Sequence, residues 1–327
     1  MFINMIKPTW RCLLHPRFVG CLCVSAPYRI MYTKITKKKY IPRHYAGRLL
    51  HTREQGNEKI KLLLRENKPF AIARYGYNEL NGMACARSKK LRLTDTVNMS
   101  VCKGVFTGAG VFPMSEDVLL RFEDVMAEAS THLDMLFCFR SIMEDYYIKS
   151  CIPQNCDLYL STGLEPYYFS EPWTKELKGK KVLVIHPFEE TIHKQYDNRK
   201  QIWGDYELLP EFELITMKAV QSAAMEQTNY STWFDALDAM YQQAVKIDFD
   251  VAILGCGAYG LPLATKLKLA GKQAIHLGGA TQVLFGIMGS RWKNHPVVSR
   301  YINEYWSKPS ITETPKQAKI VENACYW

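Results

Sequence analysis

The residues best suited to chemistry lie in a glycine-rich turn behind an apolar segment. Val251 to Leu254 is a continuous apolar run of strand length, and the residues after it have the composition of a helix that ends at Gly271. Between them, Gly255, Gly257 and Gly260 have the G-x-G-x-x-G spacing, which lets backbone N–H groups approach an anion at a helix N-terminus. The sequence therefore predicts a strand, a turn and a helix, with a diphosphate as the natural ligand. Glycines that serve only tight packing are the alternative.

A second glycine turn follows the next predicted strand, residues 273–277. Gly278 and Gly279 precede Gln282 and a helix-compatible stretch, so two turns from adjacent strands could face one cleft at the carboxyl ends of a parallel sheet. A dinucleotide-binding fold would place an acidic residue at the end of this strand for the ribose hydroxyls, and His276 stands there instead. This counts against NAD and, by family analogy, against S-adenosylmethionine.

Three charged or titratable residues follow other predicted strands. Arg74 comes directly after the apolar run 70–73 and can bind a phosphate bidentately, and Glu79 falls in the first turn of a predicted helix, where the dipole favours a carboxylate. His186 ends the apolar run 182–185 and could donate to a phosphate or a leaving group. The alternatives are that Arg74 and Glu79 pair only with each other or with the surface, and that His186 holds a loop carbonyl.

The elements that must position these residues alternate between strand and helix from residue 69 to residue 289. This alternation indicates a Rossmann-like, doubly wound α/β fold with a mostly parallel sheet. We expect one domain over residues 46–305, in two α/β halves of about 46–175 and 176–305. A last helix is predicted over 292–306, followed by a polar C-terminal tail over 306–327.

Two other segments leave alternatives open. Residues 104–113 are rich in glycine and aromatic side chains and predict a loop, which could approach a ligand or serve as a tight connection. Tyr167, Tyr168 and Trp173 could stack on a sugar or a base, but packing in the core is the better interpretation.

The positive charge of the chain is concentrated at its N-terminus. The 327 residues carry a net charge of +10, and residues 1–45 hold nine Lys or Arg and no Asp or Glu. The remainder has 33 basic and 32 acidic residues, so no nucleic-acid-binding surface is expected. The apolar run Phe18 to Ala26 is far shorter than the roughly 20 residues of a membrane helix.

Residues 1–45 are therefore predicted to be a flexible basic leader. Other interpretations are a presequence, an arm that touches anionic lipid, or an extension ahead of a start at Met31. The ten cysteines lack zinc-site spacing and indicate a reducing compartment. We expect a cytoplasmic protein with a peripheral membrane contact through the leader.

The segment from Arg74 to Glu79, Arg-Tyr-Gly-Tyr-Asn-Glu, resembles the Arg-aromatic-Gly-Asp-x-Glu signature of bacterial glycosyltransferases of the GT-D fold, a family once described as a domain of unknown function. Segments 180–188, 253–260 and 276–282 are similar to the strand and glycine-turn pattern of that family. The resemblance covers roughly residues 46–305.

This resemblance implies transfer of a hexose from a nucleoside diphosphate sugar to a hydroxyl of a glycan or glycolipid, in polysaccharide or glycoconjugate synthesis. In the family the Asp-x-Glu pair is implied to hold Mg²⁺ or Mn²⁺; here Tyr77 replaces the Asp, so Glu79 is left as a metal ligand or as a base. Arg74, Tyr77, Asn78, the glycines of both turns and Gln282 would bind the donor, with His186 as a catalytic helper. A non-catalytic sugar-nucleotide or glycan-binding protein and a Rossmann oxidoreductase are the alternatives.

Overall fold

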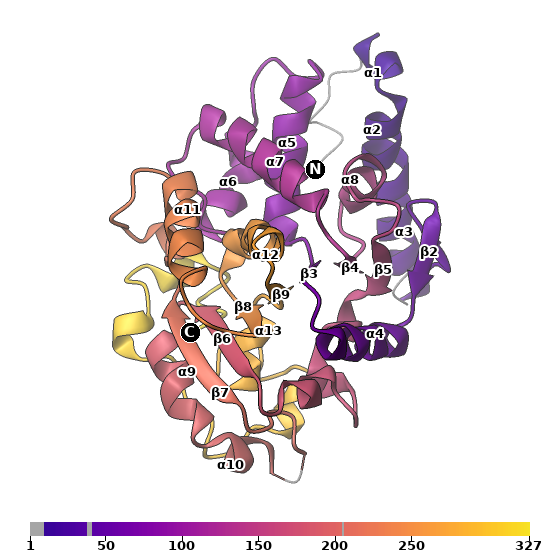
Figure 1. The fold of residues 1–327 in the computed structure, drawn as a ribbon. Coiled ribbons are helices and arrows are strands. Elements are labelled where there is room, and N and C mark those ends of the chain that lie inside the picture. The colour runs from indigo at the N-terminus through magenta and orange to yellow at the C-terminus, as the bar shows by residue number, and fades with distance from the viewer. Residues whose placement is uncertain (1–9, 38–40, 205) are drawn as a thin grey trace.

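A mostly parallel sheet runs through the middle of the molecule (Figure 1). The computed structural model describes residues 10–37, 41–204 and 206–327, and within them the sheet has nine strands in the order β1-β2-β5-β4-β3-β9-β8-β6-β7. Every neighbouring pair is parallel except β1 with β2. The strands are β1 His44–Tyr45, β2 Arg48–His51, β3 Phe70–Ala73, β4 Met135–Cys138, β5 Asp157–Leu160, β6 Lys181–His186, β7 Glu213–Lys218, β8 Val251–Leu254 and β9 Gln273–His276.

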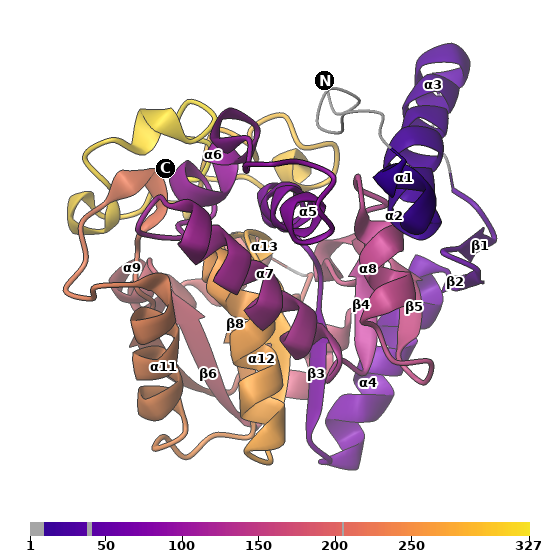
Figure 2. The same ribbon diagram turned by 90° about the horizontal axis from the view of Figure 1, so that it is seen from above.

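Helices cover both faces of this sheet (Figures 1 and 2). Val251 and Ile253 of β8 belong to one apolar core with α4, α9 and α13, whereas Ala252 and Leu254 belong to the other with α5, α7, α11 and α12. Because helices cover both faces of a mostly parallel sheet, the prediction of a doubly wound α/β fold is confirmed. The central strands could be recognised in the sequence because a strand buried on both faces must be apolar throughout. The helices are α1 Arg11–Leu14, α2 Pro16–Gly20, α3 Ala26–Thr36, α4 Arg53–Glu66, α5 Tyr77–Lys90, α6 Met99–Thr107, α7 Glu116–Ser130, α8 Glu144–Ser150, α9 Glu189–Tyr196, α10 Arg199–Trp203, α11 Trp233–Ala244, α12 Gly260–Leu269 and α13 Ala280–Leu284.

The first and second halves of the chain meet in the middle of the sheet. Strand β3 of the first half pairs in parallel with β9 of the second, with Phe70 opposite Gln273 and Ile72 opposite Ile275. Strands β3, β9, β8 and β6 are therefore consecutive, and their carboxyl ends form one continuous edge. Ligands of open α/β sheets bind at the carboxyl ends of the strands, at the point where the order of strands along the sheet reverses.

Local side-chain caps fix where two helices begin. Helix α4 begins with a capping box in which Thr52 accepts from the N–H of Gln55 and the Gln55 side chain accepts from the N–H of Thr52. Helix α7 begins after the cap Ser115, whose side chain accepts from the N–H of Val118. Trp173 and Tyr167 are buried in the core, as expected of aromatic packing.

Two predicted elements differ from the structure. Residues 104–107 belong to α6, so the glycine-rich loop is confined to residues 108–113. No α-helix forms over residues 292–306, where the structure has only the short 3₁₀ turn Val298–Arg300. A short isolated helix costs more to nucleate than it gains, and tertiary contacts hold this segment instead, because Trp306 packs edge-on against Trp203 with ring centroids 5.6 Å apart.

Residues 11–36 of the predicted flexible leader are largely helical, and His44–Tyr45 form β1. Helices α1, α2 and α3, with a π-helical turn over Cys21–Ser25, pack on the first half through the buried side chains of Phe18 and Leu22. Arg29 also forms an ion pair with Asp145 at 3.0 Å. Residues 1–9 and 38–40 lie outside the described residues. None of the described helices is long and apolar enough to cross a membrane.

The predicted polar tail, residues 306–327, is an integral part of the fold. Glu313 is fully buried and accepts hydrogen bonds from the N–H groups of Glu190 and Thr191 at the start of α9. Val321 and Cys325 are buried with Ala224 in a small apolar cluster. This segment brings residues 322–327 back to the carboxyl edge of the sheet.

Candidate functional site

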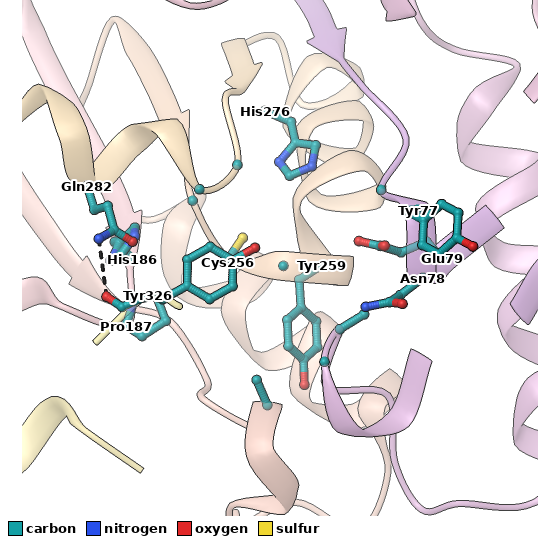
Figure 3. Close-up of a pocket in the computed structure, with 18 of the residues that line it drawn as sticks. Tyr77, Asn78, Glu79, His186, Pro187, Cys256, Tyr259, His276, Gln282 and Tyr326 are labelled. Atoms are coloured by element: carbon teal, nitrogen blue, oxygen red, sulfur yellow. Dashed lines mark hydrogen bonds between the residues drawn. The ribbon is translucent and has the colours of Figure 1, made fainter. Parts of the chain in front are cut away.

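A cleft of about 310 Å³ opens at the carboxyl ends of β3, β9, β8 and β6. It brings together every site residue that the sequence predicted except Gly260, which lies behind the His276 ring. Figure 3 shows Tyr77, Asn78 and Glu79 on one side of the cleft, and His186, Gln282 and Tyr326 on the other. The predicted residues that line it are Arg74, Tyr77, Asn78, Glu79, His186, Gly255, Gly257, Gly278, Gly279 and Gln282.

Arg74 is a largely buried cation with few partners. Its side chain is 19% exposed. The nearest carboxylate is that of Glu165, whose Oε1 lies 3.9 Å from Nη1 of Arg74. Glu165 already accepts a hydrogen bond from the Tyr167 hydroxyl at 2.8 Å. The guanidinium lies over the Phe139 ring at 4.9 Å and donates no hydrogen bond to another described residue. A buried guanidinium with unused donors is costly unless an anion completes the site.

Arg74 approaches the second glycine turn closely. A Cβ added at Gly278 would lie 2.5 Å from Nη2 of Arg74, and the φ of Gly278 is +68°. Both facts favour glycine at this position, because any side chain would displace the guanidinium and strain the turn. The two segments, 200 residues apart in the chain, therefore meet in one cleft.

Glu79 folds back over the first turn of α5. Its carboxyl group occupies the space that a Cβ at Gly76 would need, so a side chain there would displace the carboxyl group. Burial raises the pKa of Glu79 above its usual value, while a hydrogen bond from its own N–H and the charge of Arg74 oppose that rise. A carboxyl group with a raised pKa can accept a proton from a substrate near neutral pH.

Tyr77 and Asn78 occupy the first turn of the same helix but differ in environment. The Tyr77 side chain is 55% exposed at the rim of the cleft. The Asn78 amide instead lies against α6, where a Cβ at Gly108 would be 2.7 Å from its Nδ2. Asn78 therefore holds α5 to α6 as well as lining the cleft.

The two histidines of the cleft are neutral. Burial lowers the pKa of His186 to about 3, and burial together with the charge of Arg74 lowers the pKa of His276 to about 3. His186 accepts a hydrogen bond at Nδ1 from the N–H of Phe188 at 2.9 Å, so its neutral ring carries the proton on Nε2. The neutral His186 ring can therefore donate a hydrogen bond from Nε2, but it cannot act as a general acid in the way that a charged imidazolium does.

The glycine turns offer fewer free N–H groups than their spacing predicts. The N–H of Gly255 donates to Ile185 O at 3.0 Å, that of Gly278 to Leu254 O at 3.0 Å, and that of Gly260 to Gly257 O. The first two bonds extend the parallel ladder past the strand ends, and the third closes the 3₁₀ turn Gly257–Tyr259. Within the described chain, the N–H groups of Gly257 and Gly279 have no such acceptor, so these two, and not all five, remain for a ligand.

Gln282 holds the C-terminal segment. Its Nε2 donates to Ile287 O at 3.1 Å and to Tyr326 O at 3.2 Å. The dashed line in Figure 3 marks the bond from Gln282 to Tyr326. This amide nitrogen therefore has a structural role, while Gln282 lines the cleft and its contact with a nucleotide stays a prediction.

The sequence analysis missed the aromatic wall formed by the C-terminal segment. Tyr326 lies on Gly279, where a Cβ would come within 2.8 Å of its ring, and its hydroxyl accepts from Arg291 at 2.9 Å. Arg291 also forms an ion pair with Glu322 at 2.6 Å, and Trp327 lies beside Tyr326. The two adjacent aromatic residues at positions 326 and 327 were the available signal, but nothing local connects them to residue 279.

No family model and no curated protein matches the sequence. Two solved structures are similar to the chain. A selenomethionine-substituted structure of domain of unknown function 1792 has 13% sequence identity and a TM-score of 0.41, and the match covers 71% of this chain and 79% of that one. A structure of the same domain, described as having a distinct glycosyltransferase fold, has 12% identity and a TM-score of 0.41, covering 70% and 78%. Both are of the domain that the sequence resembles.

The side chains of the cleft do not fit a protein-held divalent cation. The part of the chain that the structure describes contains no group of three or more His, Cys, Asp or Glu side chains placed to bind a metal ion. Glu322 is paired with Arg291, which leaves Glu79 as the carboxylate of the β3–α5 wall. Among the described residues, the arrangement offers one arginine, Arg74, with no carboxylate closer than 3.9 Å, together with two N–H groups and one carboxyl of raised pKa.

Proposed function

We propose that this cleft binds a nucleoside diphosphate sugar and transfers its hexose to a hydroxyl of a glycan or glycolipid. The observation that carries the proposal is the Arg74 guanidinium, which is largely buried, has unused donors, and lies against Gly278 at the strand edge where α/β folds bind ligands. A diphosphate supplies the anion that this group lacks.

In this reaction the bond between the anomeric carbon and the donor phosphate oxygen breaks, and the acceptor oxygen forms the new glycosidic bond. Arg74 and the N–H groups of Gly257 and Gly279 would stabilise the charge that develops on the leaving diphosphate. Glu79 would take the proton of the acceptor hydroxyl. His186 would donate a neutral hydrogen bond from Nε2.

The test is turnover of sugar nucleotides by the full chain and by Arg74→Ala. We expect the variant to lose about 10²- to 10³-fold in kcat/KM, as for removal of a donor that stabilises transition-state charge. Arg65→Ala is the matched control, because Arg65 is an exposed arginine whose partner, Glu176, lies outside the cleft. Activity of Arg74→Ala within about twofold of the control would contradict the proposal.

A non-catalytic binding protein is a second candidate, and the observation that favours it is Tyr77. Its exposed side chain stands where the family signature has the first carboxylate, and a cleft that has lost that group could bind a sugar nucleotide without turning it over. Saturable binding of a sugar nucleotide by calorimetry, with no hydrolysis or transfer over hours, would establish this function. Binding of NAD(H) in the same assay would favour the oxidoreductase alternative, against which His276 at the end of β9 already counts.

A further inference from the structure

The outer face of the N-terminal helical segment, residues 10–37, is apolar and exposed. Val24, in the π-helical turn, and Met31 and Ile35, in the α3 helix that follows it directly, are spaced by seven and four residues, which places them near one side of this helical stretch. Their exposures are 67%, 55% and 72%, and Leu13 and Leu14 in α1 of the same segment are 82% and 61% exposed. Large apolar side chains gathered on one surface mark an interaction site more often than isolated ones do. We call Val24, Met31 and Ile35 the leader face.

The segment that carries the leader face is basic and contains no acidic residue. Arg17, Lys34 and Lys37 are exposed on the same segment, and residues 1–45 contain no Asp or Glu at all. The rest of the chain is nearly neutral. The basic charge is therefore confined to the segment that also exposes the apolar side chains.

The segment cannot turn to bury this face against its own domain, because its opposite face is already fixed there. Phe18 packs edge-on against Tyr146 with ring centroids 5.0 Å apart, and Leu22 is buried in the same core. Arg29 donates to Asp145 at 3.0 Å and to Ser141 O at 3.2 Å. The leader face is thus held outward by a docked helix.

We propose that the leader face is a docking surface for an anionic lipid bilayer. An amphipathic segment with basic residues beside exposed apolar ones lies in the interface between headgroups and acyl chains, where apolar burial and attraction to anionic lipids act together. A second copy of this chain would bring two basic, acid-free faces together and is disfavoured by their repulsion. The inference concerns where the protein is held and stands independently of the chemistry in the cleft.

The experiment is co-sedimentation of the full chain with vesicles. We expect binding to vesicles of phosphatidylcholine with about one third phosphatidylserine, little binding to phosphatidylcholine alone, and loss of binding at about 1 M NaCl, where charges are screened beyond about 3 Å. The triple variant Val24→Glu, Met31→Glu, Ile35→Glu should bind at least about tenfold more weakly.

A matched control carries the same chemical change elsewhere. Leu62→Glu, Leu269→Glu and Ile311→Glu alter three exposed apolar residues outside the leader, with exposures of 50%, 64% and 93%. This variant should bind vesicles within about twofold of the parent. A charge variant, Arg17→Gln with Lys34→Gln and Lys37→Gln, should lose the preference for anionic vesicles. Thermal unfolding must show that each variant is folded.

Any one of three results would overturn the proposal. The first is a parent protein that fails to sediment with anionic vesicles. The second is a triple leader variant that binds them as well as the control does. The third is a parent dimer, seen by sedimentation velocity, that the leader variant abolishes and the control retains, because a second copy would then cover this face.

Discussion

The two walls of the cleft differ in how they meet a ligand. The wall of β3 and α5 offers charged or titratable side chains, Arg74 and Glu79, which burial leaves with few partners. The wall of β8, β9 and the C-terminal segment offers neutral groups: histidines with lowered pKa values, two free N–H groups, and the rings of Tyr326 and Trp327. On the proposed function, the first wall supplies the cation and the base. The second wall binds the donor through neutral groups, two of which, the N–H groups of Gly257 and Gly279, also stabilise the leaving diphosphate.

The largest effect expected from this comparison is that of Glu79→Gln. We expect kcat to fall by about 10³-fold with KM within about twofold, because the variant keeps the shape of the carboxyl group and loses its proton acceptor. The matched control is Glu171→Gln, an exposed glutamate outside the cleft. If the variant instead showed a higher KM for the donor with kcat unchanged, Glu79 would bind the donor and would not act as the base.

The pH dependence of the parent should report the same group. Burial raises the pKa of Glu79, so the rate should rise with pH through a value above the usual 4.5 as the carboxyl group loses its proton. In Glu79→Gln this acidic limb should be absent. The two histidines cannot produce it, since their pKa values near 3 keep them neutral across the range.

A glycine pair tests the close approach between the walls. Gly278→Ala would place a Cβ 2.5 Å from the Arg74 guanidinium at φ +68°, whereas Gly271→Ala has φ +83° and no atom within 4 Å. Both variants should lose stability of about 1 kcal/mol from the left-handed backbone. Only Gly278→Ala should lose activity, by about tenfold, through displacement of Arg74. Equal activity in the two variants would show that the contact is not needed.

Tyr326→Ala should have a smaller effect, confined to binding. Removal of the ring from Gly279 should raise KM for the donor by about fivefold with kcat unchanged, as expected of uniform binding. Tyr326→Phe keeps the ring and loses only the bond to Arg291, so its KM should stay within about twofold of the parent. A fall in kcat for Tyr326→Ala would show that its ring also contributes to the chemical step.

The smallest effect is expected from removal of divalent cations. Because the described residues hold no group of three or more His, Cys, Asp or Glu placed to bind a metal ion, chelation with EDTA should change the rate of transfer by less than about twofold. A loss of tenfold or more that Mn²⁺ restores would show that Glu79 and the donor phosphates hold an ion together.

The elements around the site were largely predictable from local sequence. Strands at residues 70–73 and 251–254 are confirmed because a central parallel strand, buried on both faces, must be continuously apolar. The missed residues, Tyr326 and Glu313, lie in a segment whose composition is that of a tail, and only contacts with distant residues give it structure.

Local sequence was enough to predict the alternation of strands and helices, the glycine turns, and an arginine and a glutamate behind a strand. These features follow from side-chain volume, backbone freedom and helix caps, which act within a few residues. The tertiary structure alone decided that β3 pairs with β9, which brings Arg74 onto Gly278. It also decided which N–H groups remain free, that the histidines are neutral, and that the leader docks. These properties arise from burial and pairing between segments far apart in the chain, and local patterns do not encode them.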